Sequence, residues 1–201
     1  MRSLIVNAWM SLDGVVQAPS YPDEDTDGGF AHGGWHTRYF DGISQKWVAD
    51  NLAEADAFLF GRRTYDTFVA HWPNASPEEQ ALAEPLNTRA KFVVSSTLAA
   101  PLPWQNSTLI DDAPPESILS LKQAGTGSLH VIGSARLVGA LLAHDLVDEL
   151  RLMIDPVLLG GGKRIFPSGN ARRSLSLVQS QPTATGAILA TYARTPTETA
   201  S

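Results

Sequence analysis

The chain has 201 residues, of which 43% are hydrophobic and 18% charged, and its formal net charge is −6. This length and composition are typical of one globular domain with a sizeable core. The acidic balance lacks the basic footprint of nucleic-acid binding, and no apolar run reaches the roughly 18 residues of a spanning helix. The chain contains no cysteine, which excludes disulfides, thiol catalysis and cysteine-ligated zinc.

The first residues and the histidines indicate where the protein is located and whether it binds a metal. Residues 1–14, MRSLIVNAWMSLDG, are typical of a first strand, because Asn7 and Asp13 interrupt the apolar stretch that a signal peptide needs. We therefore expect a cytoplasmic protein without a membrane or nucleic-acid partner. His32 and His36 are four residues apart, but two glycines between them oppose the helix that would align them on a metal, so we expect no metal site.

Strand and helix patterns alternate along most of the chain. Helices are predicted from apolar residues at helical spacing, and strands from short continuous or alternating apolar runs. The stretch from Gln17 to Trp35 is predicted as a long loop, and loops of this length in a compact domain are often functional. In chain order the predicted elements are strand 4–9, helix 43–55, strand 57–60, helix 64–70, helix 77–86 with Ser76 as its N-cap, strands 91–96 and 107–110, helix 115–123, strand 129–133, helix 135–143, and strands 149–158, 174–180 and 187–193.

The order of these elements predicts the fold class. Strand–helix alternation followed by consecutive strands indicates an α/β sheet that is mostly parallel, with an antiparallel C-terminal edge. Ligands of such sheets bind beyond the carboxyl ends of the strands. We expect a single domain over residues 1–194 and a flexible tail over residues 195–201.

Three of the predicted parallel strands end in residues that suit phosphate. Glycine lets the backbone approach a phosphate closely, arginine offers a two-pronged donor, and the start of the following helix favours anions. Each segment alone is also an ordinary helix cap, but three of them on one sheet edge favour a shared polyphosphate ligand. The segments are Gly61-Arg62-Arg63-Thr64, Ser95-Ser96-Thr97 and Gly133-Ser134-Ala135-Arg136.

The two common nucleotide-binding motifs are absent from the sequence. No G-x-G-x-x-G follows the first strand, and the glycines at 125 and 127 come before a strand instead of after one. The segment Gly160-Gly161-Gly162-Lys163 lacks the earlier glycine of a P-loop, and Arg164 follows the lysine. A Rossmann domain and a P-loop NTPase are therefore poor interpretations.

The order of the segments resembles that of the dihydrofolate reductase superfamily. FLFGRRTYDTF (58–68) resembles its G-R-x-T segment, and FVVSS (92–96) and HVIGSARL (130–137) resemble its next two cofactor segments. LVDELRLMIDPVLLGGGKRIF (146–166) is most similar to the reductase domain of the bifunctional riboflavin-biosynthesis deaminase/reductase and its stand-alone relatives. The resemblance covers residues 1–194 and implies a dihydrofolate-reductase-like three-layer α/β sandwich. The zinc-dependent deaminase half is absent, because its signature requires cysteine.

The resemblance also implies NADPH as the cofactor. The arginines suit the 2′-phosphate that separates NADP from NAD. The glycine loop at 160–162 is implied to lie beside the nicotinamide, and it is equally a tight turn that needs positive φ. Carried over by motif, the cofactor-binding residues are Gly61, Arg62, Arg63, Thr64, Ser95, Ser96, Gly133, Ser134, Ala135, Leu137, Gly160 and Gly161.

The proton donor is not evident from the resemblance. The family keeps an acid in the first long helix, but the matching stretch DGISQKWVADNL has Gln45 near that place. Asp13 and, more weakly, Asp50 are the candidate catalytic residues. Asp13 is equally interpreted as a turn residue, and Asp50 more readily as a solvated helix residue.

The long loop continues to residue 40, and its part over residues 23–40 is a candidate substrate element with aromatic residues in it and near it. Trp9, His32 and Trp35 would suit a flat ligand, and the loop glycines would let the segment close as a lid. The alternative is a surface loop whose aromatic side chains pack on the core or on a second subunit.

These features predict an NADPH-dependent oxidoreductase that transfers a hydride to a small heterocyclic substrate of pterin, pyrimidine or ribosyl type. It would be similar to dihydrofolate reductase or to 5-amino-6-(5-phosphoribosylamino)uracil reductase. The alternative is a catalytically inactive nucleotide-binding module of the same fold. A third interpretation, a flavin- or deazaflavin-using reductase on an all-β barrel, is opposed by the strand–helix order. The resemblance to riboflavin-pathway proteins also implies a homodimer, with segment 149–158 and the C-terminal strands as candidate interface.

Overall fold

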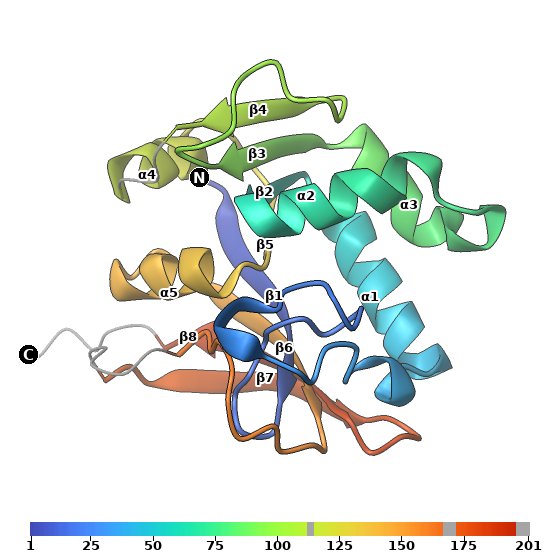
Figure 1. Cartoon of the computed structure of the whole chain (residues 1–201). Coiled ribbons are helices and arrows are strands. Elements are labelled where there is room, and N and C mark those ends of the chain that lie inside the picture. The colour runs from blue at the N-terminus through green and yellow to red at the C-terminus, as the bar shows by residue number, and fades with distance from the viewer. Residues whose placement is uncertain (112–114, 167–171, 196–201) are drawn as a thin grey trace, which may run out of the picture.

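An eight-stranded mixed sheet runs through the molecule in the order β4-β3-β2-β5-β1-β6-β8-β7 (Figure 1). The computed structural model describes residues 1–111, 115–166 and 172–195. The six neighbouring strands from β4 to β6 are parallel, and β8 and β7 add an antiparallel edge. The strands are β1 (Ser3–Ser11), β2 (Ala57–Gly61), β3 (Ala90–Val94), β4 (Ser107–Ile110), β5 (Ser128–Ile132), β6 (Glu149–Asp155), β7 (Leu175–Pro182) and β8 (Ile188–Arg194).

Helices cover both faces of this sheet (Figure 1). One core contains Leu52, Tyr65 and Leu86 from the first three helices, and the other contains Ile118 and Val138 from the last two. The result is the predicted three-layer α/β sandwich, with a mostly parallel sheet and an antiparallel C-terminal edge. The helices are α1 (Gly42–Glu54), α2 (Arg62–His71), α3 (Gln80–Thr88), α4 (Pro115–Gln123) and α5 (Ala135–Ala143).

Burial explains the strand patterns in the sequence. All five residues of β2 are buried, because helices lie on both of its faces, and this is why AFLFG is a continuous apolar run. Along β1 the side chains alternate between the two faces. Leu4 and Val6 enter the core under α4 and α5, whereas Trp9 packs on the opposite face with Trp47 of α1.

Most predicted elements differ from the structure by one to three residues at an end, and two of these differences have a clear cause. Strand β6 ends at Asp155 and not at residue 158, because Pro156 has no N–H to continue the ladder. The predicted helix 77–86 begins as a 3-10 turn, Pro77–Glu79, and continues as α3 to Thr88. The buried Nζ of Lys91 donates to the carbonyls of Leu86 and Arg89 at 2.8 and 2.9 Å, which satisfies groups at the end of this helix.

The carboxyl ends of the six parallel strands meet at one edge of the sheet, as the topology requires. The predicted tail, residues 195–201, lies outside the described residues except for Thr195. Among the described residues, the helices are all too short or too polar to cross a bilayer.

Candidate functional site

The ends of β2 and β5 fit together through their glycines. An added Cβ on Gly61 would lie 2.4 Å from Oγ of Ser134, and one on Gly133 would lie 2.5 Å from Oγ1 of Thr64. Each glycine therefore leaves the space that a hydroxyl from the other turn fills. Gly133 also has φ of +55°, a conformation that favours glycine. The two turns form one small backbone surface at the carboxyl edge, where β2 and β5 are neighbours.

Two helices begin at this surface. Gly61 is the N-cap of α2 and Ser134 is the N-cap of α5, and in the described part of the chain neither start has a side-chain cap. The first helical bond of α5 joins the Val138 N–H to the Ser134 carbonyl at 3.0 Å, so the N–H groups of Ala135 and Leu137 precede the helical ladder. Leu137 offers only its N–H, because its side chain is 6% exposed and belongs to the core. Open helix starts of this kind favour an anion.

Arg62 extends the surface toward β3. Its guanidinium donates to Oγ1 of Thr97 at 2.7 Å and pairs with Asp66 at 3.3 Å, and the side chain is exposed. Ser95 is buried, and its hydroxyl accepts the N–H groups of Thr97 and Leu98. Ser96 is exposed. The three predicted strand ends thus lie side by side. Thr97, which contacts Arg62, belongs to the Ser95-Ser96-Thr97 segment but is not among the cofactor-binding residues that the resemblance implies.

Arg63 points to a different partner. Its guanidinium pairs with both Asp25 and Asp27 of the long loop. Lys163, at the end of the glycine loop, pairs with the same two carboxylates at 2.5 and 2.9 Å. We call these four residues the ionic latch, because they join the long loop, α2 and the glycine loop. Lys163 and Arg63 hold the pKa of the Asp27 carboxyl below its usual range.

Asp13 organises the glycine loop. Its carboxylate accepts the Ser11 hydroxyl at 2.7 Å and the N–H groups of Leu159 and Gly160 at 3.1 and 2.9 Å. The Ser11 hydroxyl, together with the two N–H groups, lowers the pKa of Asp13 to about 2. A carboxylate with this pKa has no proton to donate near neutral pH, so its geometry fits the turn interpretation. Gly160 has φ of +75°. Both Gly160 and Gly161 are exposed to solvent.

The structure does not bring Asp50 to this group of residues. Its carboxylate pairs with Lys46, 2.8 Å away, on the exposed face of α1. This is the solvated helix position that was the alternative interpretation, and we propose no catalytic role for it.

The three aromatic candidates occupy different environments. Trp35 is buried, and its indole N–H donates to the Gln17 carbonyl at 2.8 Å, so it packs within the loop. His32 is exposed and lies edge-on to Phe30, with 5.6 Å between the ring centroids. Trp9 stacks on His36, with 4.2 Å between the ring centroids and 14° between the planes. Trp35 also lies edge-on to His36, with 6.1 Å between the ring centroids, so two of the three candidates lie beside a buried titratable group.

That group, the pair His36 and Asp155, was not identified from the sequence. Nδ1 of His36 lies 2.8 Å from Oδ2 of Asp155, and both side chains are buried. The residues are 119 positions apart, so no local spacing connects them. The available signals were a histidine in a loop already suspected of function and an aspartate at the end of a buried strand.

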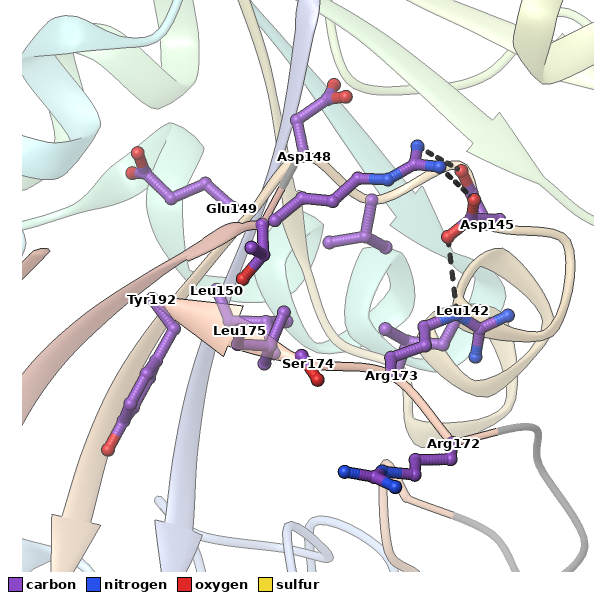
Figure 2. A pocket seen from close by; sticks show the side chains of 13 residues that line it. Leu142, Asp145, Asp148, Glu149, Leu150, Arg172, Arg173, Ser174, Leu175 and Tyr192 are labelled. Carbon is purple, nitrogen blue, oxygen red and sulfur yellow. Dashed lines mark hydrogen bonds and ion pairs between the residues drawn. The ribbon is translucent and has the colours of Figure 1, made fainter. Parts of the chain in front are cut away.

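A hollow of about 590 Å³ lies at the opposite end of the sheet, beside the first residues of β6 (Figure 2). Arg173 and Arg194 line it, and both pair with Asp145. Arg172 also lines the hollow and points away from this pair (Figure 2). The hollow is far along the strands from the carboxyl edge and contains none of the predicted site residues.

Comparison with known proteins agrees with this architecture. The Bacillus subtilis (strain 168) uncharacterized protein YyaP is 27% identical over 202 residues, covering 95% of this chain and 94% of the relative. A putative riboflavin biosynthesis protein from Shewanella sp. PV-4 has a TM-score of 0.66 at 20% identity, covering 96% of this chain and 99% of the other. Dihydrofolate reductase from Enterococcus faecalis, complexed with NADP(H) and RAB-propyl, has a TM-score of 0.62 at 13% identity, covering 96% and 97%.

A family model matches almost the whole chain. The RibD C-terminal domain model covers residues 2–189, a range that includes β1, the three phosphate-type strand ends and the glycine loop. The chain therefore belongs to the RibD C-terminal domain family, and its fold is that of the dihydrofolate reductases.

Proposed function

We propose that this protein is an NADPH-dependent reductase that transfers a hydride to a small heterocyclic substrate of pterin, pyrimidine or ribosyl type. The observation that carries the proposal is the surface formed by the Gly61 and Gly133 turns at the starts of α2 and α5. Membership of the RibD C-terminal domain family supports a reductase-type activity. The likeness to a dihydrofolate reductase complexed with NADP(H) supports a nicotinamide dinucleotide.

The residues at this surface fit the phosphates of such a cofactor. The N–H groups at the start of α5 would hold the pyrophosphate, because they are donors without side-chain caps among the described residues. The exposed guanidinium of Arg62, beside Thr97, would hold the 2′-phosphate. The loop that Asp13 organises would border the nicotinamide, through Gly160 and Gly161. When bound, the reduced nicotinamide would supply the hydride.

In this proposal Arg63 contacts a cofactor phosphate only after its ion pairs in the long loop have broken. Its guanidinium is paired with Asp25 and Asp27, so a cofactor phosphate would compete with these carboxylates for it. Arg62 is therefore the stronger candidate for reading the 2′-phosphate, and Arg63 contributes when the ionic latch opens.

The test is titration of the protein with NADPH and with NADH, followed by quenching of tryptophan fluorescence. We expect NADPH to bind more tightly than NADH by about 10- to 100-fold, as one or two charge-assisted bonds to the 2′-phosphate would give. The double variant Arg62→Ala with Arg63→Ala should abolish this difference. The matched control is Arg89→Ala with Arg172→Ala, which removes two exposed arginines elsewhere and should keep the difference.

A second measurement separates the enzyme from an inactive nucleotide-binding module. NADPH oxidation is followed with 5-amino-6-(5-phosphoribosylamino)uracil and with dihydrofolate. Steady oxidation with either compound supports the reductase. Tight NADPH binding without oxidation supports the inactive module, and failure to bind either cofactor contradicts both.

A further inference from the structure

The His36–Asp155 pair lies at the carboxyl edge of the sheet, outside the residues assigned to the cofactor. Asp155 is the last residue of β6 and is 0% exposed, and His36 comes from the long loop and is 2% exposed. The His36 ring stacks on Trp9 of β1 and contacts Phe40, with 5.5 Å between ring centroids. The pair is thus an ionisable couple enclosed by aromatic side chains.

Half of the hydrogen-bonding capacity of this pair is unused. Within the described residues, Nε2 of His36 and Oδ1 of Asp155 are both buried and have no partner. A buried polar atom without a partner costs about 1–3 kcal/mol, and most such atoms in folded proteins are paired. The Asn7–His130 pair within the sheet also has two such atoms, so missing partners alone do not indicate a ligand. The His36–Asp155 pair differs in its place, between a loop and the carboxyl end of β6, where a ligand could supply the missing partners.

The position of the pair suits the reacting end of a bound dinucleotide. The phosphate-type turns are on β3, β2 and β5, and the next parallel strands along the edge are β1 and β6. A dinucleotide that extends from the β5 turn therefore reaches β1 and β6, which lie one and two strand spacings away, or about 5 and 10 Å. Asp155 lies beside Ser11 in the sheet register. The Ser11 hydroxyl donates to the carboxylate of Asp13, and this carboxylate accepts the N–H of Gly160 in the glycine loop.

Asp13 and Asp50, the other acids considered as proton donors, are poorly suited to that role. The Ser11 hydroxyl and two backbone N–H groups lower the pKa of Asp13 to about 2, and Asp50 is exposed on α1. Burial raises the pKa of Asp155, an effect that its bond to His36 partly offsets. The contact of 2.8 Å between Oδ2 of Asp155 and Nδ1 of His36 holds the ring in place and leaves Nε2 as the ring nitrogen that can meet a substrate.

We propose that His36, oriented by Asp155, is the proton donor of the reduction. When bound, the reduced nicotinamide would supply the hydride to the carbon of a substrate C=N or C=O group. His36 would give the proton on Nε2 to the neighbouring nitrogen or oxygen, return to the neutral imidazole and regain a proton from solvent. Asp155 is a positioning residue that fixes the ring. This proposal rests on the reductase function proposed above.

Movement of the long loop gives the substrate access to the donor in this proposal. His36 is carried by this loop, and the ionic latch of Asp25, Asp27, Arg63 and Lys163 ties the same loop to α2 and the glycine loop. In the conformation that the structure shows, Nε2 of His36 is buried. A cofactor phosphate that displaces the latch would release the loop, and a shift of the loop that keeps Nδ1 of His36 on Asp155 would expose Nε2 to the substrate.

The experiment compares the wild type with His36→Gln and Asp155→Asn, using NADPH with dihydrofolate or with 5-amino-6-(5-phosphoribosylamino)uracil. General acid catalysis contributes about 10²- to 10⁴-fold, so we expect His36→Gln to lower kcat by at least about 100-fold. Asp155→Asn should lower it by a smaller factor. KM and the affinity for NADPH should change by less than about threefold. His144→Gln, at the exposed end of α5, is the control and should behave as the wild type.

The pH profile of the wild type provides a reading that does not depend on the variants folding. The groups that act electrostatically on His36 among the described residues are Asp155 from β6 and Glu24 from its own loop, while β1 presents the uncharged Trp9. We expect kcat to fall as the pH rises, because the donor must carry its proton, and His36→Gln should remove this dependence.

Three outcomes would overturn the inference, and they are distinguishable from one another. A wild type that binds NADPH but oxidises it with neither compound removes the proposed function, and the inference falls with it. Normal turnover in His36→Gln leaves the function standing and makes the pair a structural anchor of the loop. A wild-type rate that does not change with pH also excludes a titrating donor.

Discussion

His130 is fully buried on β5, where its Nδ1 lies 3.1 Å from the Asn7 side-chain amide. Burial, with a smaller contribution from the charge of Arg151, lowers the pKa of this histidine to about 4. An unfolded chain would bind a proton at this histidine below about pH 6.5, whereas the folded protein resists protonation down to about pH 4. The unfolded state therefore binds more protons within this window.

The expected result is a loss of stability as the pH falls through this window. The contribution of His130 is fully present above about pH 6.5, and up to about 3 kcal/mol of it is lost by about pH 4. The variant His130→Gln removes the titrating group, so its free energy of unfolding should depend less on pH. Urea unfolding at neutral pH and at about pH 5 measures the difference.

His144→Gln is the control for this prediction. His144 is exposed at the end of α5, and its replacement should leave the pH dependence of the wild type intact. An identical acid-induced loss in wild type and His130→Gln would show that other groups govern the response.

At the scale of elements, the ionic latch pairs Arg63 with two aspartates of the long loop, and a phosphate that binds Arg63 would have to replace them. Asp25 and Asp27 engage both Arg63 and Lys163, and exposed ion pairs are individually weak, at about 0–1 kcal/mol each. A network of four groups is therefore strong enough to hold the loop and weak enough for a bound phosphate to displace. Cofactor binding and loop closure should then compete for Arg63.

The double variant Asp25→Asn with Asp27→Asn tests this competition. With the carboxylates neutralised, Arg63 is free to contact a phosphate, and we expect the affinity for NADPH to rise by about 3- to 10-fold. Tryptophan fluorescence titration measures it. The matched control is Glu78→Gln with Glu84→Gln, which also removes two negative charges, from exposed positions in the 3-10 turn before α3 and on α3 itself. An equal gain in both double variants would attribute the effect to net charge alone.

The elements themselves were largely predictable, because their signals are local. The apolar run before Gly61 indicated a buried strand, and the alternation of strands and helices indicated parallel neighbours, so the three phosphate-type ends were expected at one edge. The pairing of His36 with Asp155 was not predictable, because it joins a loop to a strand 119 positions later. The engagement of Arg63 by the long loop was missed for the same reason: its partner Asp25 is 38 positions earlier.

At the scale of the whole molecule, β7 is an exposed edge strand. All eight of its residues are exposed, and no described residue pairs with its outer side. Leu175, Leu177 and Val178 are 43%, 56% and 61% exposed, and the strand LSLVQSQP carries no charge. Natural edge strands are usually protected by charges, proline or bulges. β7 ends with Pro182 and has a register shift between Leu177 and Gln179, but it has no charge, and its exposed apolar residues favour pairing with another strand. Segment 149–158, in contrast, cannot provide such an edge, because β6 lies between β1 and β8.

We predict a homodimer in which β7 of one protomer pairs antiparallel with β7 of the other about a two-fold axis. Light scattering coupled to size exclusion should give twice the 21.6 kDa of the chain. Leu177→Lys with Val178→Lys should shift the mass to that of the monomer, because like charges would then face each other across the axis. Leu119→Lys, a similar change at an exposed position on α4, should leave the dimer intact. A wild-type mass of one chain at all concentrations tested would exclude the β7 interface.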